Sequence, residues 1–169
     1  QTCALPISMV IESGGTSVLL AERGIGTVSR VDLASGTRTV VASGYVNLAS
    51  VALAPDGSFA LVSADHLYRL TLPSGPSVQV GSVVSGPIAA TVETSATTAV
   101  WTDGYNLERV TLSSGASTVL ATTSTLGINM SGGTLIPGTF GGTFYTSDGY
   151  CLGRVTTVGP PSGQRIACQ

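Results

Sequence analysis

The sequence predicts an all-β fold, a β-propeller of about four blades with four antiparallel strands each. A motif of arginine, an apolar residue and a later Ser-Gly pair recurs four times, with its arginines 39, 40 and 45 residues apart. Short apolar runs alternate with Gly- and Ser-rich turns inside each period, as in all-β folds. Only 9% of the 169 residues are charged and 43% are hydrophobic, which fits strands that stacked blades bury on both faces.

The motif begins at Arg30, Arg69, Arg109 and Arg154. Its strict repetition favours a structural role for the arginine over a ring of ligand-facing side chains. We expect this side chain to face solvent or to pair with an acid on an adjacent blade. No segment shows a sustained helical period. A β-sandwich is the alternative fold, but a sandwich does not require a repeating sequence unit.

The repeat divides the chain into predicted blades at residues 8–45, 46–86, 87–126 and 127–169. Strands are expected at 18–20, 28–33 and 39–41 in the first blade, and at 98–101, 107–110 and 118–120 in the third. The fourth blade is less regular, because a short insertion separates Arg154 from Ser162 and Gly163.

The second blade shows the pattern most clearly. A strand at 51–53 leads to Pro55-Asp56-Gly57, a sequence that favours a β-turn. Residues 59–62 are continuously apolar, which predicts a strand buried on both faces, and residues 67–72 alternate between apolar and polar. A Pro-Ser-Gly turn then precedes the last strand at 78–80.

Residues 1–7 resemble the conceptual translation of a common short-read sequencing adapter over seven codons. We expect this segment to be non-native, so that the propeller sequence covers residues 8–169. The alternative is an ordinary extended N-terminal segment. The expected truncation favours an incomplete fragment of a larger ring over a closed four-bladed ring.

Charge and hydropathy exclude several classes of partner. The net charge is −2, and all seven basic residues are arginines. This balance offers no basic footprint for nucleic acid, so none is expected as a partner. No apolar run approaches the roughly 20 residues of a membrane-spanning helix, so direct membrane insertion is not expected.

Cys151 and Cys168 lie 17 residues apart, without further Cys or His at the spacing of a zinc site. A disulfide between them would close a short loop and stabilise the fold by roughly 3 kcal/mol. Two buried free thiols are the alternative. A disulfide would persist only in an oxidising compartment, and we expect an extracellular or periplasmic location in a bacterium.

The blades resemble known propeller repeats. Residues 51–62, followed by Leu67-Tyr68-Arg69-Leu70, resemble the blades of NHL-type and gluconolactonase-like propellers. Val100-Trp101-Thr102-Asp103 resembles the Tyr-Trp-Thr-Asp repeat of receptor-type propellers. These groups share a TolB-like architecture that is usually six-bladed. Their members include lactonases, sensors, scaffolds and ligand-binding modules, so the resemblance implies a fold and leaves the activity open.

The resemblance allows one activity to be checked residue by residue. In gluconolactonase-like enzymes, an Asn six residues before the proline of the Pro-Asp-Gly-like turn helps bind the catalytic divalent metal. Ala49 occupies that position here, and Asn47 is out of register by two. The family's metal-binding Asp matches Ala64 in the second blade and Asp103 in the third. We therefore expect neither a metal site nor catalytic residues in these blades.

The loops between second and third strands are the best binding candidates, because equivalent loops leave a propeller on one face. Their acidic, aromatic and polar residues predict the site: Asp65, His66, Asp103, Tyr105, Asn106, Asp148 and Tyr150. The alternatives are that the Asp side chains bond turn amides within their own blades, and that the lone histidine is a solvated loop residue.

These residues predict a non-catalytic binding or scaffold module that recognises a protein, a glycan or a small molecule and needs no cofactor. One alternative is a metal-dependent lactonase or hydrolase with its site mainly in missing blades, in which case a divalent metal such as calcium would be needed. Another is a spacer or sensor domain of a larger membrane-anchored protein.

Overall fold

The computed structural model describes residues 5–81, 89–127, 130, 134–137, 143–147, 151–156 and 162–168. These residues form four four-stranded antiparallel sheets and one short helix. In each sheet the strands are paired in the order in which they occur along the chain. Every sheet, or blade, is therefore built from one continuous stretch of sequence.

The strands of the four blades have the following bounds. The first blade contains β1 (Pro6–Ile11), β2 (Ser17–Glu22), β3 (Thr27–Asp32) and β4 (Arg38–Ser43). The second contains β5 (Ser50–Leu53), β6 (Phe59–Ser63), β7 (Leu67–Thr71) and β8 (Ser77–Gln79). The third contains β9 (Ala89–Val92), β10 (Thr98–Thr102), β11 (Asn106–Thr111) and β12 (Ser117–Thr122), followed by helix α1 (Thr123–Leu126). The fourth contains β13 (Thr134–Pro137), β14 (Thr143–Ser147), β15 (Cys151–Thr156) and β16 (Ser162–Cys168).

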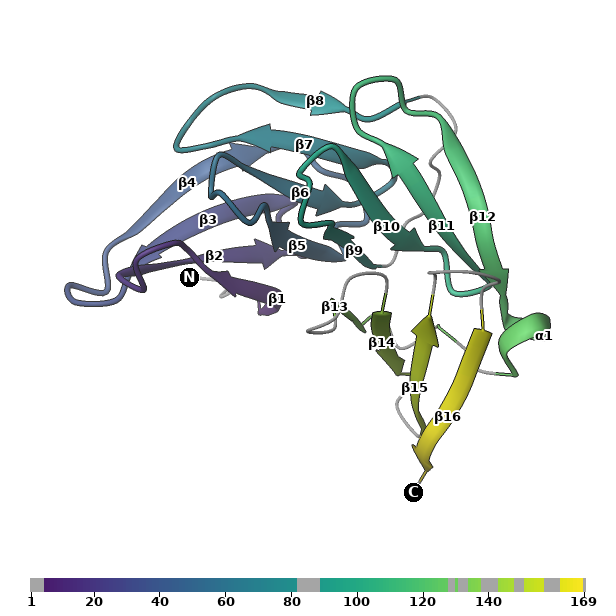
Figure 1. Cartoon of the computed structure of the whole chain (residues 1–169). Coiled ribbons are helices and arrows are strands. Elements are labelled where there is room, and N and C mark those ends of the chain that lie inside the picture. Colours follow the sequence, from purple (N-terminus) through teal and green to yellow (C-terminus); the bar gives the residue numbers. More distant parts are fainter. Residues whose placement is uncertain are drawn as a thin grey trace.

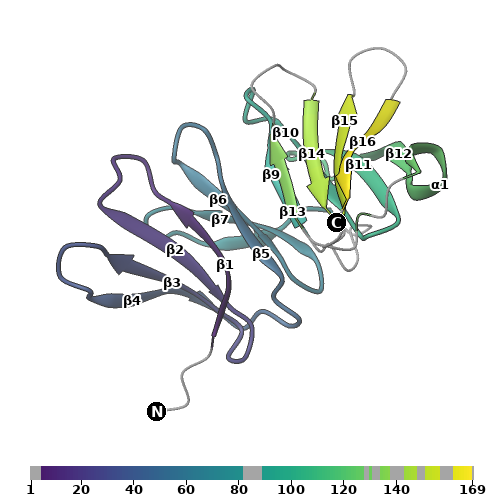
Figure 2. The same ribbon diagram turned by 90° about the horizontal axis from the view of Figure 1, so that it is seen from below.

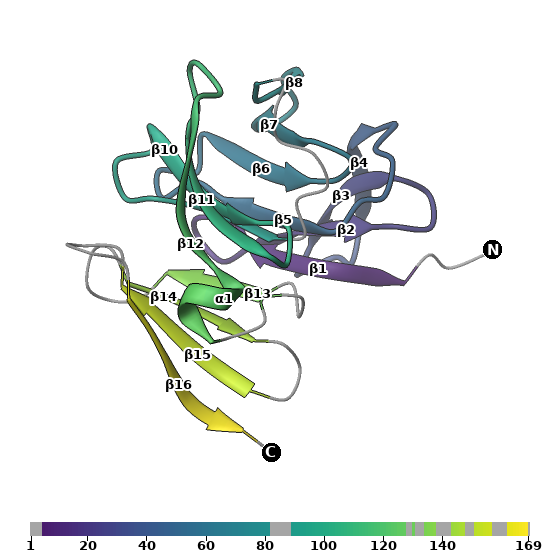
Figure 3. The same cartoon turned by 90° about the vertical axis from the view of Figure 1, so that its right-hand side faces the viewer.

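The blades stand side by side along an open arc (Figure 1). Their first strands β1, β5, β9 and β13 contact one another in that order and form the inner side of the arc. The first and fourth blades lie at opposite ends of the arc (Figures 2 and 3). One face of each end blade is therefore not covered by another described blade.

Apolar side chains fill the space between neighbouring blades. Leu19 and Val28 of the first blade pack with Val51 and Val62 of the second. Phe59 and Leu61 on the other face of the second blade belong to a cluster with Trp101 and Val92 of the third. A third cluster joins Val100 and Leu107 of the third blade to Phe144 and Val155 of the fourth.

The burial of β6 and β7 can be compared with the sequence pattern. Every residue of β6 is buried, as its continuous apolar run predicts. β7 follows the predicted alternation less strictly, because Arg69 shares a face with buried Leu67 yet remains exposed. The described residues contain no helix that is long and apolar enough to cross a membrane.

Candidate functional site

The repeated arginine pairs with an acid of its own blade. Arg30 bonds both carboxylate oxygens of Glu12, at 2.5 and 2.7 Å, and Arg109 bonds both oxygens of Glu93, at 2.8 Å each. Both acids follow the first strand of the same sheet. The expectation of an acid on an adjacent blade is therefore wrong, because antiparallel pairing brings the end of the first strand close to the third strand.

The second and fourth blades hold this arginine differently. Ala54 occupies the repeat position of the acid in the second blade, and the Arg69 guanidinium lies over the Phe59 ring at 4.3 Å from its centroid. Arg154 donates to Gln164 Oε1 at 2.6 Å. In all four blades the arginine is thus engaged within its own sheet, which supports a structural role.

Asp103 organises the β10–β11 turn. Its Oδ1 accepts hydrogen bonds from the backbone N–H groups of Tyr105 and Asn106 at 2.8 and 2.7 Å, and its Oδ2 accepts from Asn106 Nδ2 at 3.0 Å. Burial raises the pKa of the Asp103 carboxyl, but the Asn106 and Tyr105 N–H groups outweigh this effect and hold the pKa below its usual value. The turn is closed by its own hydrogen bonds, and the Tyr105 side chain at its tip is 74% exposed.

The equivalent loop of the second blade is tied to two tyrosines. Asp65 Oδ1 accepts from the Tyr68 hydroxyl at 3.1 Å, and the Tyr68 ring meets the Tyr45 ring edge-on at 5.3 Å. The His66 ring lies 6.4 Å from the Tyr68 ring. Burial and the bond to Asp65 both raise the pKa of Tyr68. Asp65 N–H also donates to the Val46 carbonyl at 2.7 Å, which fixes this loop to the β4–β5 connection.

In the first blade the corresponding acid is bonded inside its own sheet. Glu22 is buried, and its Oε2 accepts from Thr27, Ser29 and Arg38. Burial raises the pKa of Glu22, but these hydrogen bonds together hold it below the usual value. Glu22 is therefore held inside its own sheet, in contrast to the loop residues of the second and third blades.

The predicted site residues lie in loops of like position or, for Asn106, at the start of the strand that follows, because each sheet has the same strand order. The second blade contributes Asp65 and His66, and the third contributes Asp103, Tyr105 and Asn106. The predicted Asp148 and Tyr150 of the fourth blade lie outside the described residues. The alternative that the aspartates bond turn amides within their own blades describes the contacts of Asp103, whereas the Asp65 carboxylate accepts from the Tyr68 hydroxyl of its own blade. The turn that Asp103 closes presents the exposed Tyr105 side chain.

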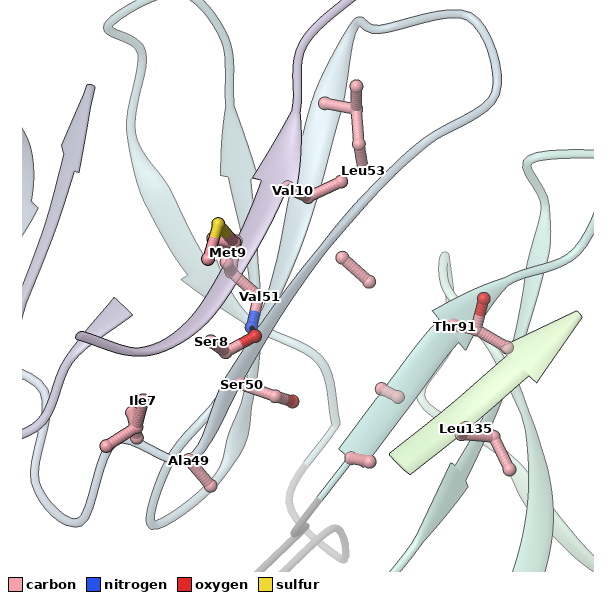
Figure 4. Close-up of a pocket in the computed structure, with 13 residues that line it drawn as sticks. Ile7, Ser8, Met9, Val10, Ala49, Ser50, Val51, Leu53, Thr91 and Leu135 are labelled. Atoms are coloured by element: carbon pink, nitrogen blue, oxygen red, sulfur yellow. Dashed lines mark hydrogen bonds between the residues drawn. The ribbon is translucent and has the colours of Figure 1, made fainter. Parts of the chain in front are cut away.

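A hollow of about 450 Å³ on the inner side of the arc was missed by the sequence analysis. It lies between β1, β5, β9 and β13 (Figure 4), and none of its lining residues is charged. Its polar side chains are Ser8, Ser50 and Thr91. Ser8 Oγ accepts from the Val51 N–H at 3.2 Å, whereas the buried Ser50 Oγ has no hydrogen-bond partner. The sequence carries no clear signal for it, because the first strands that line it include Ile7, Met9 and Leu135 beside small residues.

The described residues do not assemble a metal site. They contain no group of three or more His, Cys, Asp or Glu side chains that could hold a metal ion. Ala49, at the position of the expected metal-binding Asn, lines the inner hollow. Asn47 lies between β4 and β5 with a φ of +54°.

The two C-terminal cysteines are opposed in the last hairpin. Cys151 of β15 and Cys168 of β16 are direct partners in the backbone register. Directly opposed residues of antiparallel strands have Cα atoms about 4.5–5.5 Å apart, within the range of disulfides. The disulfide remains a prediction that this register supports.

No protein-family model matches the chain, and no curated protein matches its sequence. Solved structures share its fold. A chain of a nidogen–laminin complex superimposes with a TM-score of 0.80 at 12% identity, over 97% of this chain and 65% of that one. An auxiliary nutrient binding protein from Bacteroides thetaiotaomicron gives 0.79 at 12% identity, over 98% and 42%. A catalytically inactive virginiamycin B lyase from Staphylococcus aureus, solved with quinupristin, gives 0.74 at 13% identity, over 100% and 57%.

These likenesses define the class of fold. The chain is a partial β-propeller, and it matches six-bladed propellers over about half of their length. The predicted all-β propeller is confirmed. The chain spans less than two thirds of each of these three structures, whose identities to it are too low to indicate a shared activity.

Proposed function

We propose that this protein is a non-catalytic binding module that recognises its ligand through the loops between the second and third strands of its blades. The observation that carries the proposal is the β10–β11 turn. Asp103 closes this turn with three hydrogen bonds, and Tyr105 stands exposed at its tip. An aromatic side chain on a turn held in this way loses little conformational entropy when it meets a ligand.

The chemistry of the loops supports a ligand with both apolar and hydrogen-bonding surface. The Tyr105 ring offers an apolar face and its hydroxyl a polar tip. His66 and Tyr68, both half-buried, supply further aromatic groups beside the equivalent loop of the second blade, and the buried Tyr45 ring packs edge-on behind Tyr68. A sugar ring or a peptide side chain presents the matching groups. The shared fold with a nutrient binding protein also supports a binding role.

The described blades lend no support to the lactonase alternative. Asp103, which matches a metal-binding aspartate of that family, has both carboxylate oxygens engaged by its own turn. Within the propeller class, we propose blades of the NHL or Tyr-Trp-Thr-Asp type. We also propose an extracellular or periplasmic location, which the opposed cysteines of the last hairpin support.

The proposal is tested by screening the protein against a glycan array and a peptide library, and by titrating each hit calorimetrically. Tyr105→Ala is expected to weaken binding at least tenfold. The matched control Val78→Ala removes another exposed side chain, on β8 at the outer edge of the second blade, and is expected to leave the affinity unchanged. Hits that Tyr105→Ala leaves unaffected, or the absence of any hit in both screens, would overturn the proposal.

A further inference from the structure

Two turns at the junction of the first and second blades carry exposed aliphatic side chains, which we call the aliphatic patch: Ile25 and Val46. Ile25 lies in the β2–β3 turn and is 50% exposed, and Val46 lies in the β4–β5 connection and is 58% exposed. Turns favour Gly, Asn, Asp, Pro and Ser, whereas β-branched aliphatic residues favour strands. Neither local propensity nor packing in the core therefore accounts for these two side chains.

Backbone hydrogen bonds bring the two turns together. The Tyr45 N–H donates to the Gly26 carbonyl at 3.1 Å, so the residues next to Ile25 and Val46 in the chain are bonded to each other. The Asp65 N–H donates to the Val46 carbonyl at 2.7 Å and joins the β6–β7 loop to the same row. The aliphatic patch thus lies beside a loop of the proposed binding site.

The residues beneath the patch hold it in place. Gly26 is buried with a φ of +62°, and a Cβ at this position would collide with the Tyr45 carbonyl. The Tyr45 side chain is buried, and its hydroxyl lies 2.8 Å from Ser77 Oγ. Because both turns are anchored in this way, a ligand that meets the aliphatic patch spends little free energy on ordering them.

The repeat relates Ile25 to Tyr105. The last register pair of β2 and β3 encloses residues 23–26, and the last register pair of β10 and β11 encloses residues 103–106. Ile25 and Tyr105 are each the third residue of their enclosed segment, and each follows a glycine. An exposed apolar side chain at the tip of this turn is therefore a repeated feature, and in the first blade this side chain is aliphatic.

A positive charge adjoins the patch. Arg23 is exposed in the same turn as Ile25. Its neighbour Glu22 is paired with Arg38 at 2.6 Å, and Arg23 takes part in none of the ion pairs between residues that the structure describes. A carboxylate of the ligand is the group that complements this arginine.

We propose that the aliphatic patch and Arg23 bind a polypeptide segment of a partner protein, in which an aliphatic side chain lies close to a carboxylate. This inference rests on the proposed function and names the class of its ligand. The aliphatic side chain packs on Ile25 and Val46, and the carboxylate pairs with Arg23. A glycan fits the patch poorly, because aliphatic side chains offer its hydroxyl groups no hydrogen bonds and its sugar rings no aromatic face.

The test selects binders from a random peptide library displayed on phage, and measures the affinity of the corresponding synthetic peptides for the 169-residue chain by calorimetry. The selected peptides are expected to share an aliphatic residue close to Asp or Glu. Ile25→Ser and Val46→Ser are each expected to weaken binding about tenfold, because an aliphatic contact is lost. The matched control Leu33→Ser changes a 53% exposed side chain in the β3–β4 turn, at the other end of the first blade, and is expected to leave the affinity unchanged.

An exchange of charges tests Arg23 separately. Arg23→Glu is expected to weaken the binding of an acidic peptide at least fivefold, and replacing the acidic residue of the peptide by Lys is expected to restore part of this loss. Binding to the unchanged protein is expected to weaken as the salt concentration rises, because salt screens exposed charges. Arg23→Gln is expected to remove this dependence. Equal salt dependence in the two proteins would refute the role of Arg23.

The outcomes separate this inference from the proposed function. Peptides whose binding Tyr105→Ala weakens, but Ile25→Ser and Val46→Ser do not, would overturn the inference and leave the proposed function standing. Glycan binders without peptide binders would do the same. A peptide that Ile25→Ser weakens and Tyr105→Ala does not would overturn the proposed function alone.

Two further outcomes would also overturn the inference. The absence of any binder would overturn it together with the proposed function. Binding to vesicles of phosphatidylcholine and phosphatidylserine that Ile25→Ser abolishes, without any peptide binder, would instead identify a membrane surface as the partner of the patch.

Discussion

The ion pair between Arg109 and Glu93 can be measured by a double-mutant cycle of Arg109→Ala and Glu93→Ala. Arg109 makes two 2.8 Å bonds to the carboxylate, and Thr98 adds a third at 2.6 Å. Hydrogen bonds to charged groups contribute about 1.5–3 kcal/mol when buried, and exposed ion pairs about 0–1 kcal/mol. The side chains here are 33% and 17% exposed, so a coupling energy near 1 kcal/mol is expected, between these limits.

Glu93→Ala alone is expected to cost more than the coupling energy, about 2 kcal/mol, because it also removes the acceptor of the Thr98 hydroxyl. That loss corresponds to a fall in Tm of roughly 4–8 °C for a domain of this size. The four proteins of the cycle are compared by urea unfolding at pH 7, where the carboxylate is ionised.

The second blade supplies a natural control, because Ala54 replaces the acid there. Arg69→Ala removes the contact with the Phe59 ring, worth about 0.5–1 kcal/mol at an exposed site. A coupling energy below about 0.3 kcal/mol, the scatter expected of independent sites, would refute the reasoning. So would an Arg69→Ala variant that is as destabilised as Arg109→Ala.

Three further outcomes are expected. The bond to Arg30 holds the pKa of Glu12 below its usual value, and the bonds to Glu93 outweigh its burial and lower its pKa as well. Because the unfolded chain then binds more protons than the folded protein below about pH 4.3, calorimetry should show the Tm falling from pH 6 to pH 3. A constant Tm would show that these bonds are absent in solution. Leu107→Ala empties a fully buried position between the third and fourth blades and should cost about 2–5 kcal/mol in urea unfolding, whereas a loss below about 1 kcal/mol would contradict the packing. In protein purified without reductant, Cys151 and Cys168 should resist alkylation until a reductant is added; immediate labelling of both would exclude the disulfide.

The fold could be predicted because the turns and strands of each repeat depend on residues that are close together in the sequence. The Pro55-Asp56-Gly57 turn and the apolar run of β6 depend on neighbouring residues alone, and the structure has the strand where the pattern indicates it. The partner of the repeated arginine depends on register across three strands. Glu12 and Glu93 occupy the same repeat position, and this was the signal that could have identified them.

The candidate site was predictable only in part. Loop composition singled out Asp103 and Tyr105 but did not distinguish their roles. The geometry of the turn shows that Asp103 closes the loop and that the Tyr105 ring is exposed. The inner hollow could not be predicted, because Ser50 and Thr91 come from strands of different blades. Their proximity depends on how the sheets are arranged.

The pairing of strands in sequence order has a consequence for the synthesis of the protein. Each blade contains all of its own strands, so a nascent chain can complete one sheet as soon as that stretch has left the ribosome. A blade of about 40 residues emerges in roughly 2–8 s, whereas a hairpin closes in about 1–10 μs. Each sheet can therefore form long before the next is synthesised, and every newly formed blade becomes the template on which the following one packs.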